Sequence, residues 1–237
     1  MDDTKTIVII PTINELSGLK KIIPKLAKLD LDILVVDDNS TDDSRKFLQD
    51  SKKNMSGRLN FIFRDKSHGF RAAYFAGFEK ALDGSYQQIV MMDGDGAHDP
   101  EMIPKMLEDI SAGFDLVIGS RYAKGGEVKS FSPWRRFTSV CSNWLIRQFV
   151  SRRILDWTSG FIAIRAELLK KIIKYDYARG FSFLVQIKRN AIAVGAKVTE
   201  IPIHFINPTN AKSKFNLKIA WEAFLVFVKI ITSKDHE

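Results

Sequence analysis

The sequence predicts an α/β fold with a mostly parallel, open sheet and helices on both faces. Short apolar runs of strand length alternate with longer amphipathic segments, which is the pattern of β-α-β units with right-handed crossovers. Polar residues gather directly after several runs, at the strand ends where such sheets bind ligands. The 237 residues suffice for one domain of this kind with a sizeable core, and nothing in this length requires a second.

The first half of the chain predicts five strands and four helices. A continuous β-branched run at 6–11 is typical of a strand covered on both faces, and the segment after it is amphipathic. Good N-caps follow the second strand, and Asp99-Pro100 opens the fourth helix. We expect strands at 6–11, 32–36, 59–63, 89–92 and 115–119, and helices at 16–29, 70–82 and 100–112, with a further helix after the second strand that runs to about residue 53.

The regular alternation ends after Arg121. The remaining elements are a basic and aromatic helix at 132–153, a polar turn at 156–160 leading into a strand that ends at 165, helices at 167–175 and 181–194, and a strand at 197–205. Residues 207–213 are small and polar, and 215–231 form an apolar helix interrupted by three charges. We therefore divide the chain into a domain at 1–212 and a C-terminal amphipathic helix with a tail at 213–237.

The terminal helix is a poor membrane span. Lys218, Glu222 and Lys229 share one narrow helical face inside a window shorter than the roughly 20 apolar residues that a span needs. A helix lying in the membrane interface, or packing on a membrane partner, fits this pattern better. A core-packed terminal helix is the alternative.

The composition favours anionic partners in a reducing compartment. The net charge is +8, which suits nucleic acid, a phosphate-bearing substrate or an acidic membrane surface. Basic residues alternate with large aromatic ones in the segment 124–153, which fits a bilayer interface, a single-stranded nucleic acid or a solvated helix face. The single cysteine, Cys141, excludes a disulfide framework, and the first residues do not resemble a secretory leader.

The stretch 88–100 predicts a divalent metal site. An apolar strand ends in Asp93 and Asp95, with Gly94 between them, so both carboxylates can converge where the chain turns. Such a pair suits a hard cation whose shell is completed by a substrate diphosphate. A calcium loop starting at Asp93 fails at three of its ligand or turn positions, and a turn merely rich in Asp and Gly is the plainer alternative.

Other strand ends carry matching polar residues. The first strand is followed by Thr12, Ile13, Asn14 and Glu15, the second by Asp37 and Asp38, and the fifth by Arg121. Because these ends face the same edge of a parallel sheet, we expect one shared crevice. Asp37 or Asp38 is placed to accept hydrogen bonds from a base or ribose, while the other of the pair caps its helix.

These motifs together resemble the GT-A, family 2 glycosyltransferases and most of all the dolichol-phosphate (polyprenol-phosphate) mannose synthases. Any one motif is weak, but their order along nearly the whole chain is specific. The segments that carry the resemblance are Ile9-Ile10-Pro11-Thr12-Ile13-Asn14-Glu15, Val35-Val36-Asp37-Asp38-Asn39-Ser40, Met92-Asp93-Gly94-Asp95-Gly96-Ala97-His98-Asp99-Pro100, Gly119-Ser120-Arg121-Tyr122, Asp156-Trp157-Thr158-Ser159-Gly160 and Ser213-Lys214.

The resemblance implies a GT-A fold and a nucleotide-sugar donor, GDP-mannose or a UDP-sugar. Mg²⁺ or Mn²⁺ would hold the donor diphosphate at Asp93 and Asp95, and Arg121 and Lys214 would neutralise phosphates. It also implies a lipid phosphate acceptor at the cytosolic face of a membrane. The implied nucleotide-sugar site consists of Pro11, Thr12, Ile13, Glu15, Val36, Asp37, Asp38, Gly94, Asp95, Arg121 and Lys214.

Four positions depart from the synthase pattern. Ile13 replaces an aromatic residue, Ile162 and Pro208 replace arginines, and Gln186 replaces an acidic residue. The nucleotide and metal half of the pattern is intact, whereas the sugar and acceptor half is altered. These changes bear on the identity of the sugar and the lipid more than on transfer itself.

The resulting hypothesis is a metal-dependent inverting glycosyltransferase that acts on a polyprenyl phosphate, with Asp95, Arg121 and Lys214 in catalysis. The basic helix and the amphipathic terminus would bring the acceptor near, with a transmembrane partner as a further anchor. A sugar hydroxyl acceptor is the runner-up, and it would need a base, for which Asp156 is the candidate. The remaining rivals are a nucleotide-binding scaffold without activity and a single-strand nucleic-acid binder, which leaves the strand-end carboxylates unused.

Overall fold

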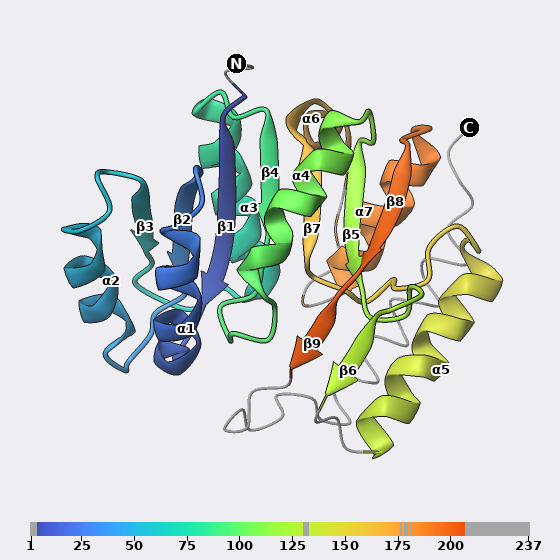
Figure 1. Cartoon of the computed structure of the whole chain (residues 1–237), viewed down its shortest axis with the longest axis horizontal. Coiled ribbons are helices and arrows are strands. Elements are labelled where there is room, and N and C mark those ends of the chain that lie inside the picture. The colour runs from blue at the N-terminus through green and yellow to red at the C-terminus, as the bar shows by residue number, and fades with distance from the viewer. Residues whose placement is uncertain (1–3, 130–132, 176, 178–179, 181, 207–237) are drawn as a thin grey trace.

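The computed structural model describes residues 4–129, 133–175, 177, 180 and 182–206 (Figure 1). The predicted loop at 207–213, the terminal helix at 215–231, Pro208 and Lys214 lie outside these residues. The domain boundary expected at residue 212 lies there too.

A seven-stranded sheet with the order β3-β2-β1-β4-β7-β5-β8 forms the centre of the molecule (Figure 1). Neighbouring strands are parallel except β7, which runs antiparallel to β4 and β5. The predicted α/β class with a mostly parallel sheet is therefore confirmed. The strands are β1 (Thr6–Thr12), β2 (Asp32–Asp37), β3 (Leu59–Phe63), β4 (Gln88–Met91), β5 (Leu116–Ser120), β7 (Ile162–Arg165) and β8 (Val198–Pro202).

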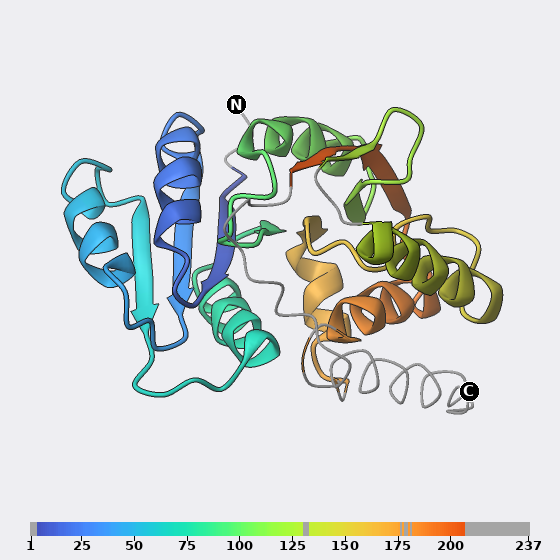
Figure 2. The ribbon, with the colours of Figure 1, turned by 90° about the horizontal axis from the view of Figure 1, so that it is seen from below.

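Helices cover both faces of this sheet, as predicted (Figure 2). Buried side chains of α1, α2 and α4 join one hydrophobic cluster, and those of α3, α6 and α7 join the other. Among the described helices, none is long and apolar enough to cross a membrane. The helices are α1 (Leu16–Leu26), α2 (Ser44–Lys52), α3 (Phe70–Asp83), the 3₁₀ turn η1 (Pro100–Met102), α4 (Ile103–Ser111), α5 (Pro133–Phe149), α6 (Ala166–Ile172) and α7 (Ser182–Ala193).

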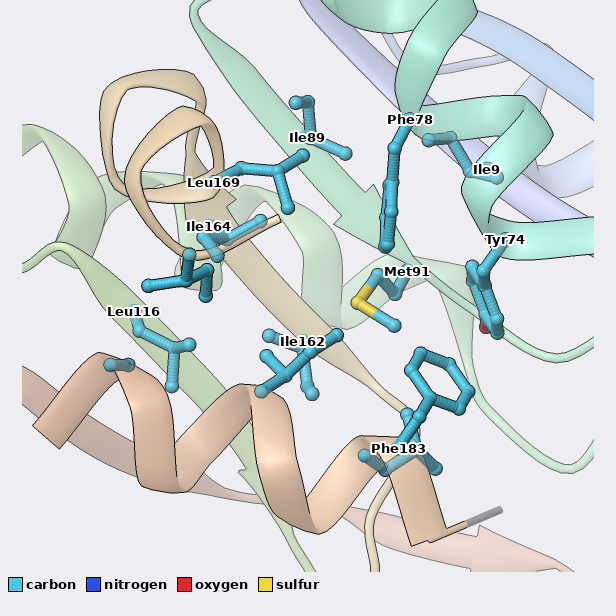
Figure 3. Close-up of a cluster of buried hydrophobic side chains, with 14 of the residues drawn as sticks. Ile9, Tyr74, Phe78, Ile89, Met91, Leu116, Ile162, Ile164, Leu169 and Phe183 are labelled. Carbon is cyan, nitrogen blue, oxygen red and sulfur yellow. The ribbon is translucent and has the colours of Figure 1, made fainter. Parts of the chain in front are cut away.

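The strand register explains why the central strands are apolar without interruption. Along β1, Ile7 and Ile9 enter the cluster with α3, whereas Val8 and Ile10 enter the cluster with α1. Successive side chains of a strand point to opposite faces, so a strand covered on both sides needs apolar residues at every position. Figure 3 shows the α3 side, where Tyr74, Phe78 and Phe183 surround Met91.

Two predicted elements are divided in the structure. The helix expected at 100–112 begins as η1 and continues as α4, because Pro104 has no N–H to donate to an i−4 carbonyl. The strand expected at 197–205 is β8 followed by β9 (His204–Ile206), and β9 pairs with the unexpected β6 (Glu127–Lys129). Ile203 lies between β8 and β9. Its N–H donates to the Ser120 carbonyl at 3.0 Å, and its carbonyl accepts from the Glu127 N–H at 3.0 Å.

Candidate active site

The order of the strands places the switch point of the sheet, where a ligand crevice is expected, at the carboxyl ends of β1 and β4. The chain proceeds from β1 to β2 and β3 on one side and then crosses back to place β4 on the other. Open α/β sheets bind their ligands at this kind of switch point. Pro11 and Thr12 end β1, Val36 and Asp37 end β2, and these four residues are buried.

Asp93 and Asp95 follow β4 without a strong cation beside them. The Tyr74 hydroxyl donates to Asp93 Oδ1 at 3.4 Å, His98 Nε2 lies 3.6 Å from Asp93 Oδ2, and the Ala97 N–H donates to Asp95 Oδ1 at 2.9 Å. Within the described part of the chain, no lysine or arginine forms an ion pair with either carboxylate. Burial, and next the charge of Asp93, raise the pKa of Asp95.

This donor set fits a divalent cation. Two adjacent carboxylates repel one another in a partly buried site, and a cation between them removes that repulsion. Carboxylate oxygens are the ligands that Mg²⁺ and Mn²⁺ prefer, and substrate phosphates and waters usually complete their shells. The described residues contain no cluster of three or more His, Cys, Asp or Glu side chains that could hold a metal ion.

Gly18 of α1 allows the loop that carries Gly94 and Asp95 to lie directly on the helix. A Cβ at Gly18 would stand 2.2 Å from the Gly94 carbonyl oxygen and 2.5 Å from the Asp95 carbonyl carbon. Real Cβ atoms do not come so close to backbone, so only glycine fits here. Gly18 was not predictable from the sequence, because this contact joins segments far apart in the chain.

Asp37, at the end of β2, and Asp38, directly after it, have different surroundings. Asp37 Oδ1 accepts from Arg45 Nε at 2.5 Å and from the Ser40 N–H at 3.1 Å, while its buried Oδ2 has no partner among the described residues. Asp37 is fully buried, so this oxygen is a buried acceptor without a hydrogen bond among the described residues. The bond of Asp37 to the Ser40 N–H closes a turn before α2, and the helix cap predicted for one residue of the pair is wrong, because α2 begins at Ser44 with Asp43 at its N-cap position.

Asp38 anchors the loop between β3 and α3. Its carboxylate accepts from Ser67 Oγ at 2.6 Å and from the Gly69 N–H at 2.8 Å, and it forms an ion pair with Arg64 at 3.1 Å. Burial opposes the charge of Asp38, but these hydrogen bonds outweigh it and lower its pKa.

Asn14 joins the loop after β1 to the loop after β2. Its backbone φ is +54°, and its side-chain oxygen accepts from the Thr41 N–H at 2.7 Å.

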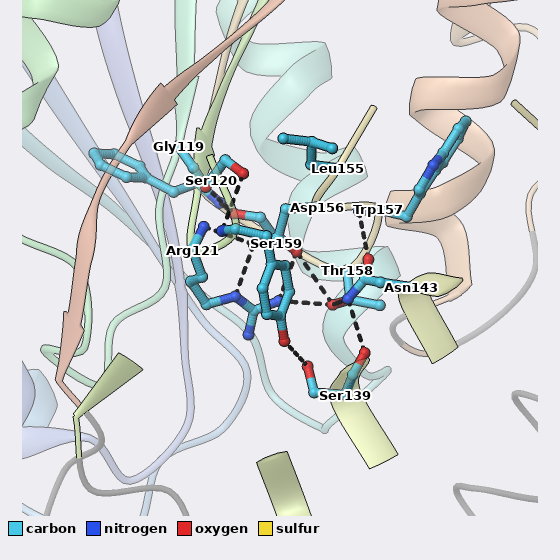
Figure 4. Close-up of polar contacts among 12 residues, drawn as sticks. Gly119, Ser120, Arg121, Ser139, Asn143, Leu155, Asp156, Trp157, Thr158 and Ser159 are labelled. Carbon is cyan, nitrogen blue, oxygen red and sulfur yellow. Dashed lines mark hydrogen bonds and ion pairs between the residues drawn. The ribbon is translucent and has the colours of Figure 1, made fainter. Parts of the chain in front are cut away.

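Arg121, directly after β5, and Asp156 form a bidentate ion pair (Figure 4). Arg121 Nη2 lies 2.7 Å from Asp156 Oδ1, Nε lies 2.8 Å from Oδ2, and Nη2 also donates to Thr158 Oγ1 at 2.6 Å. The Arg121 side chain is 9% exposed and that of Asp156 is 0% exposed. Burial disfavours the charge on Asp156, but Arg121 outweighs this effect and lowers the pKa of the carboxyl group.

The turn at 156–160 is tethered from four directions. Asn143 of α5 accepts from the Trp157 N–H at 2.7 Å, and Ser159 Oγ donates to the Gly119 carbonyl at 2.6 Å (Figure 4). Glu200 of β8 accepts from the Asp156 N–H at 2.9 Å. From α7, Lys188 donates to the carbonyls of Trp157 at 2.9 Å and Ser159 at 2.7 Å. At its end, a Cβ on Gly160 would lie 3.3 Å from Asp93 Oδ2.

Lys188, Asn143, Glu200 and Tyr74 are site residues that the sequence analysis did not single out. For Lys188 the sequence held a signal: the residue lies on the apolar face of its helix, four positions after Leu184 and three before Ala191. A lysine at such a position is rarely buried without a reason. The other three had no comparable signal, because only the tertiary fold brings them to the turn or to Asp93.

A pocket of about 220 Å³ opens beside Arg121, toward α5. Asp156 and Thr158 accept from Nε and Nη2 of Arg121, and Nη1 has no hydrogen bond to the residues that the structure describes. Two further predicted site residues, Ile13 and Glu15, are half-buried in the loop after β1. The pocket is lined by Arg121, Tyr122, Gly126, Glu127, Val128 and Arg136.

The structure describes three of the four residues that depart from the synthase pattern. Ile162 is fully buried in β7 and packs in the core, and Ile13 lies in the first loop of the crevice. Gln186 lies on α7 and is half-buried, two residues before Lys188. Lys214 and Pro208 lie outside the described residues, so their predicted places stay predictions.

Comparison with proteins of known sequence supports the resemblance. The chain is 37% identical over 216 residues to a polyprenol monophosphomannose synthase of Mycolicibacterium smegmatis, covering 90% of this chain and 81% of that protein. It is 32% identical over 222 residues to an undecaprenyl-phosphate mannosyltransferase of Micrococcus luteus, covering 92% and 90%. A dolichol-phosphate mannosyltransferase of Pyrococcus furiosus is 34% identical over 224 residues, covering 92% of this chain and 61% of that protein.

The solved structures show the fold, and the family follows from the sequence. Glucosyl-3-phosphoglycerate synthase of Mycobacterium tuberculosis, solved with Mn²⁺, UDP and glucosyl-3-phosphoglycerate, superposes with a TM-score of 0.72 at 16% identity, covering 99% of this chain and 82% of that one. The fold is thus GT-A, as the resemblance implied. Residues 7–173 match the family described as glycosyl transferase family 2. The chain therefore belongs to family 2 of the glycosyl transferases and is a glycosyltransferase.

Proposed function

We propose that this glycosyltransferase moves mannose or glucose from GDP-mannose or a UDP-sugar to a polyprenyl phosphate at the cytosolic face of a membrane. The observation that carries the proposal is the pair Asp93 and Asp95, which stands at the β1–β4 switch point without a lysine or arginine partner in the described residues. The names of the three relatives, all transferases of mannose to a polyprenyl phosphate, support the acceptor class.

The donor site would use Asp93 and Asp95 to hold Mg²⁺ or Mn²⁺ against the donor diphosphate. The solved relative that binds Mn²⁺ and UDP on the same fold supports a divalent ion. When bound, the ion stabilises charge on the leaving nucleoside diphosphate. Asp37, with its unpartnered Oδ2, and the loop anchored by Asp38 would line the nucleoside part of the site.

A phosphate acceptor suits the side chains beside Arg121. Its second pKa is near 6, so at pH 7 it is already an anionic nucleophile and needs no protein base. Its oxygen would form the new bond to the anomeric carbon as the bond to the diphosphate breaks, and the electron pair leaves with the nucleotide. A sugar hydroxyl would need a base, and Asp156 is a weak one because its oxygens accept from Arg121 and its pKa is lowered.

We place the acceptor phosphate in the pocket of about 220 Å³ beside Arg121. Arg121 and Arg136 both line it, and Lys214 is a further predicted cation. Helix α5 would then lie against the membrane, since its Trp144 is 57% exposed, Val140 46% and Leu145 36%. Exposed apolar side chains beside basic ones are typical of helices that lie in a bilayer interface.

The acceptor class is tested by incubating the protein with Mn²⁺ or Mg²⁺, labelled GDP-mannose or UDP-glucose, and undecaprenyl phosphate in vesicles. We expect a labelled product that extracts with the lipid and is released by mild acid, because a sugar phosphate ester is acid-labile. A product that resists mild acid would favour the sugar hydroxyl acceptor. Nucleotide binding without any transfer or donor hydrolysis would favour an inactive scaffold.

The membrane surface is tested with Trp144→Glu and vesicles that contain an anionic lipid. A carboxylate at this position would have to enter the apolar interface, so we expect weaker sedimentation with the vesicles and unchanged nucleotide binding. Tyr175→Glu is a matched control, because Tyr175 is also exposed, at 45%, but lies outside α5. Equal loss in both variants, or in neither, would contradict attachment through α5 and favour a transmembrane partner as the anchor.

A further inference from the structure

Lys188 is a fully buried ammonium whose described hydrogen bonds both go to backbone. Its side chain extends from α7, and Nζ donates to the carbonyls of Trp157 at 2.9 Å and Ser159 at 2.7 Å. The residue is 0% exposed, so its charge cannot reach water by extending the chain. Burying an ammonium is unfavourable for folding, which makes a purely structural lysine an unfavourable choice at this position.

Both carbonyls belong to the turn that connects the two halves of the site. Residue 156 of this turn pairs with Arg121, and Thr158 accepts from the same guanidinium. The turn ends at Gly160, which lies against the carboxylate of Asp93. A shift of this backbone would therefore move the partner of Arg121 and the surroundings of Asp93 together.

Charged groups around Lys188 balance its charge. Burial lowers the pKa of Lys188 to about 7, and the charge of Arg121 acts in the same direction, while Asp156 and Glu200 oppose it. With Lys188 protonated, the two cations and two carboxylates of this cluster sum to zero. Lys188 therefore links α7 to the 156–160 turn and to the charged side chains of Arg121, Asp156 and Glu200.

We propose that Lys188 is a positioning residue, which holds the 156–160 turn through two backbone carbonyls and so keeps Arg121 and Asp93 in their active arrangement. Among the described residues its hydrogen bonds reach only these two carbonyls, and neither belongs to a predicted metal ligand. The residue serves transfer rather than stability. Its removal relieves the burial of an ammonium while it leaves two carbonyls unpaired, so the two effects on folding oppose each other.

The test is Lys188→Met, which keeps the length and apolar body of the side chain but removes its donors. We expect kcat to fall on the order of 10–100-fold, as for other groups that orient site residues, with the melting temperature close to that of the wild type. The rate is counted per nucleotide–Mn²⁺ binding site, so loss of folded protein does not enter it. A wild-type kcat in the folded variant would overturn the proposal.

Lys188→Gln supplies a second variant and Lys170→Met a matched control. Glutamine keeps N–H donors on a shorter side chain that cannot span both carbonyls, so we expect a kcat between those of Lys188→Met and the wild type. Should Lys188→Met fail to fold, this variant decides, and a wild-type kcat in it would overturn the proposal. Lys170 is exposed on α6, and we expect its replacement to leave kcat unchanged.

The inference rests on the transferase activity and not on the acceptor. A wild type that is inactive with polyprenyl phosphate contradicts the proposed acceptor. The same variants are then compared by metal-dependent hydrolysis of the donor, which needs no acceptor, with the same expected order. Equal hydrolysis by Lys188→Met and the wild type would overturn the positioning role, whichever acceptor is correct.

Discussion

Two parallel hydrogen bonds join Arg121 to Asp156, with Nη2–Oδ1 at 2.7 Å and Nε–Oδ2 at 2.8 Å. This geometry holds the guanidinium plane in one orientation at the end of β5 and aims Nη1 away from the carboxylate. The ion pair therefore couples the turn at 156–160 to the strand-end crevice.

Replacing Asp156 by asparagine should destabilise the fold strongly. Arg121 would keep its charge in a buried place without a matching carboxylate, a change that typically costs about 3–5 kcal/mol. Urea unfolding at pH 7 measures the loss. The control is Asp50→Asn, whose exposed pair with Lys53 should leave stability unchanged.

Acid supplies an independent check of that pair. The pKa of Asp156 is lowered from 3.8, so its contribution is complete above pH 3.8 and is lost as the pH falls through the lowered value. The stability difference between wild type and Asp156→Asn should therefore shrink below pH 3.8. A difference that stays constant in acid would contradict the ion pair.

Tyr74→Phe should weaken metal binding while the fold remains intact. The hydroxyl donates to Asp93 Oδ1 at 3.4 Å, and its ring stays packed against Phe70 and Phe183 when the oxygen is removed. Loss of a group that orients a ligand typically reduces metal affinity about 10–100-fold, and so long a bond favours the low end. Titration with Mn²⁺, followed by electron paramagnetic resonance in the presence of nucleotide, measures the affinity.

Tyr86→Phe is the control for this experiment. Its hydroxyl donates to Asp32 Oδ2 at 2.6 Å, at the opposite end of the sheet from the crevice. Unchanged Mn²⁺ affinity in Tyr74→Phe, or an equal loss in Tyr86→Phe, would contradict the role assigned to Tyr74.

The buried ammonium of Lys188 predicts that stability rises in base. Its pKa is about 7 in the folded protein and 10.5 as the ordinary value, so between these pH values the unfolded chain binds the proton and the folded chain does not. Stability from this group should therefore increase as pH rises from 7 to 10, by at most about 1.4 kcal/mol per pH unit. The Lys188→Met variant lacks this increase, and a pH-independent difference between the two proteins would contradict it.

Much of the fold followed from local patterns in the sequence. The β-branched runs at 6–11 and 32–36 became β1 and β2 because continuous apolar residues suit strands covered on both faces. The antiparallel direction of β7 did not follow, since Ile162–Arg165 carries no sign of its direction. The three residues of β6 are too short for a periodic signal.

The candidate site was foreseeable where its residues end strands. Apolar runs of strand length lead into Asp37, Asp93, Asp95 and Arg121, which predicts that these residues share one edge of the sheet. Contacts between distant segments, such as Gly18 with Gly94 and Lys188 with Trp157, become visible only when the chain is folded. The ion pair of Asp156 with Arg121 likewise joins residues that are 35 positions apart in the sequence.

The central claim is that Asp93 and Asp95 bind a nucleoside diphosphate through a divalent metal. The most direct measurement is thermal stabilisation of wild type and Asp95→Ala by GDP and by UDP, each with and without Mn²⁺. A ligand at a hundred times its dissociation constant should add about 2.7 kcal/mol. We expect one nucleotide to stabilise the wild type only with metal, and Asp95→Ala to abolish the effect; no stabilisation of the wild type by either nucleotide with metal would contradict the claim.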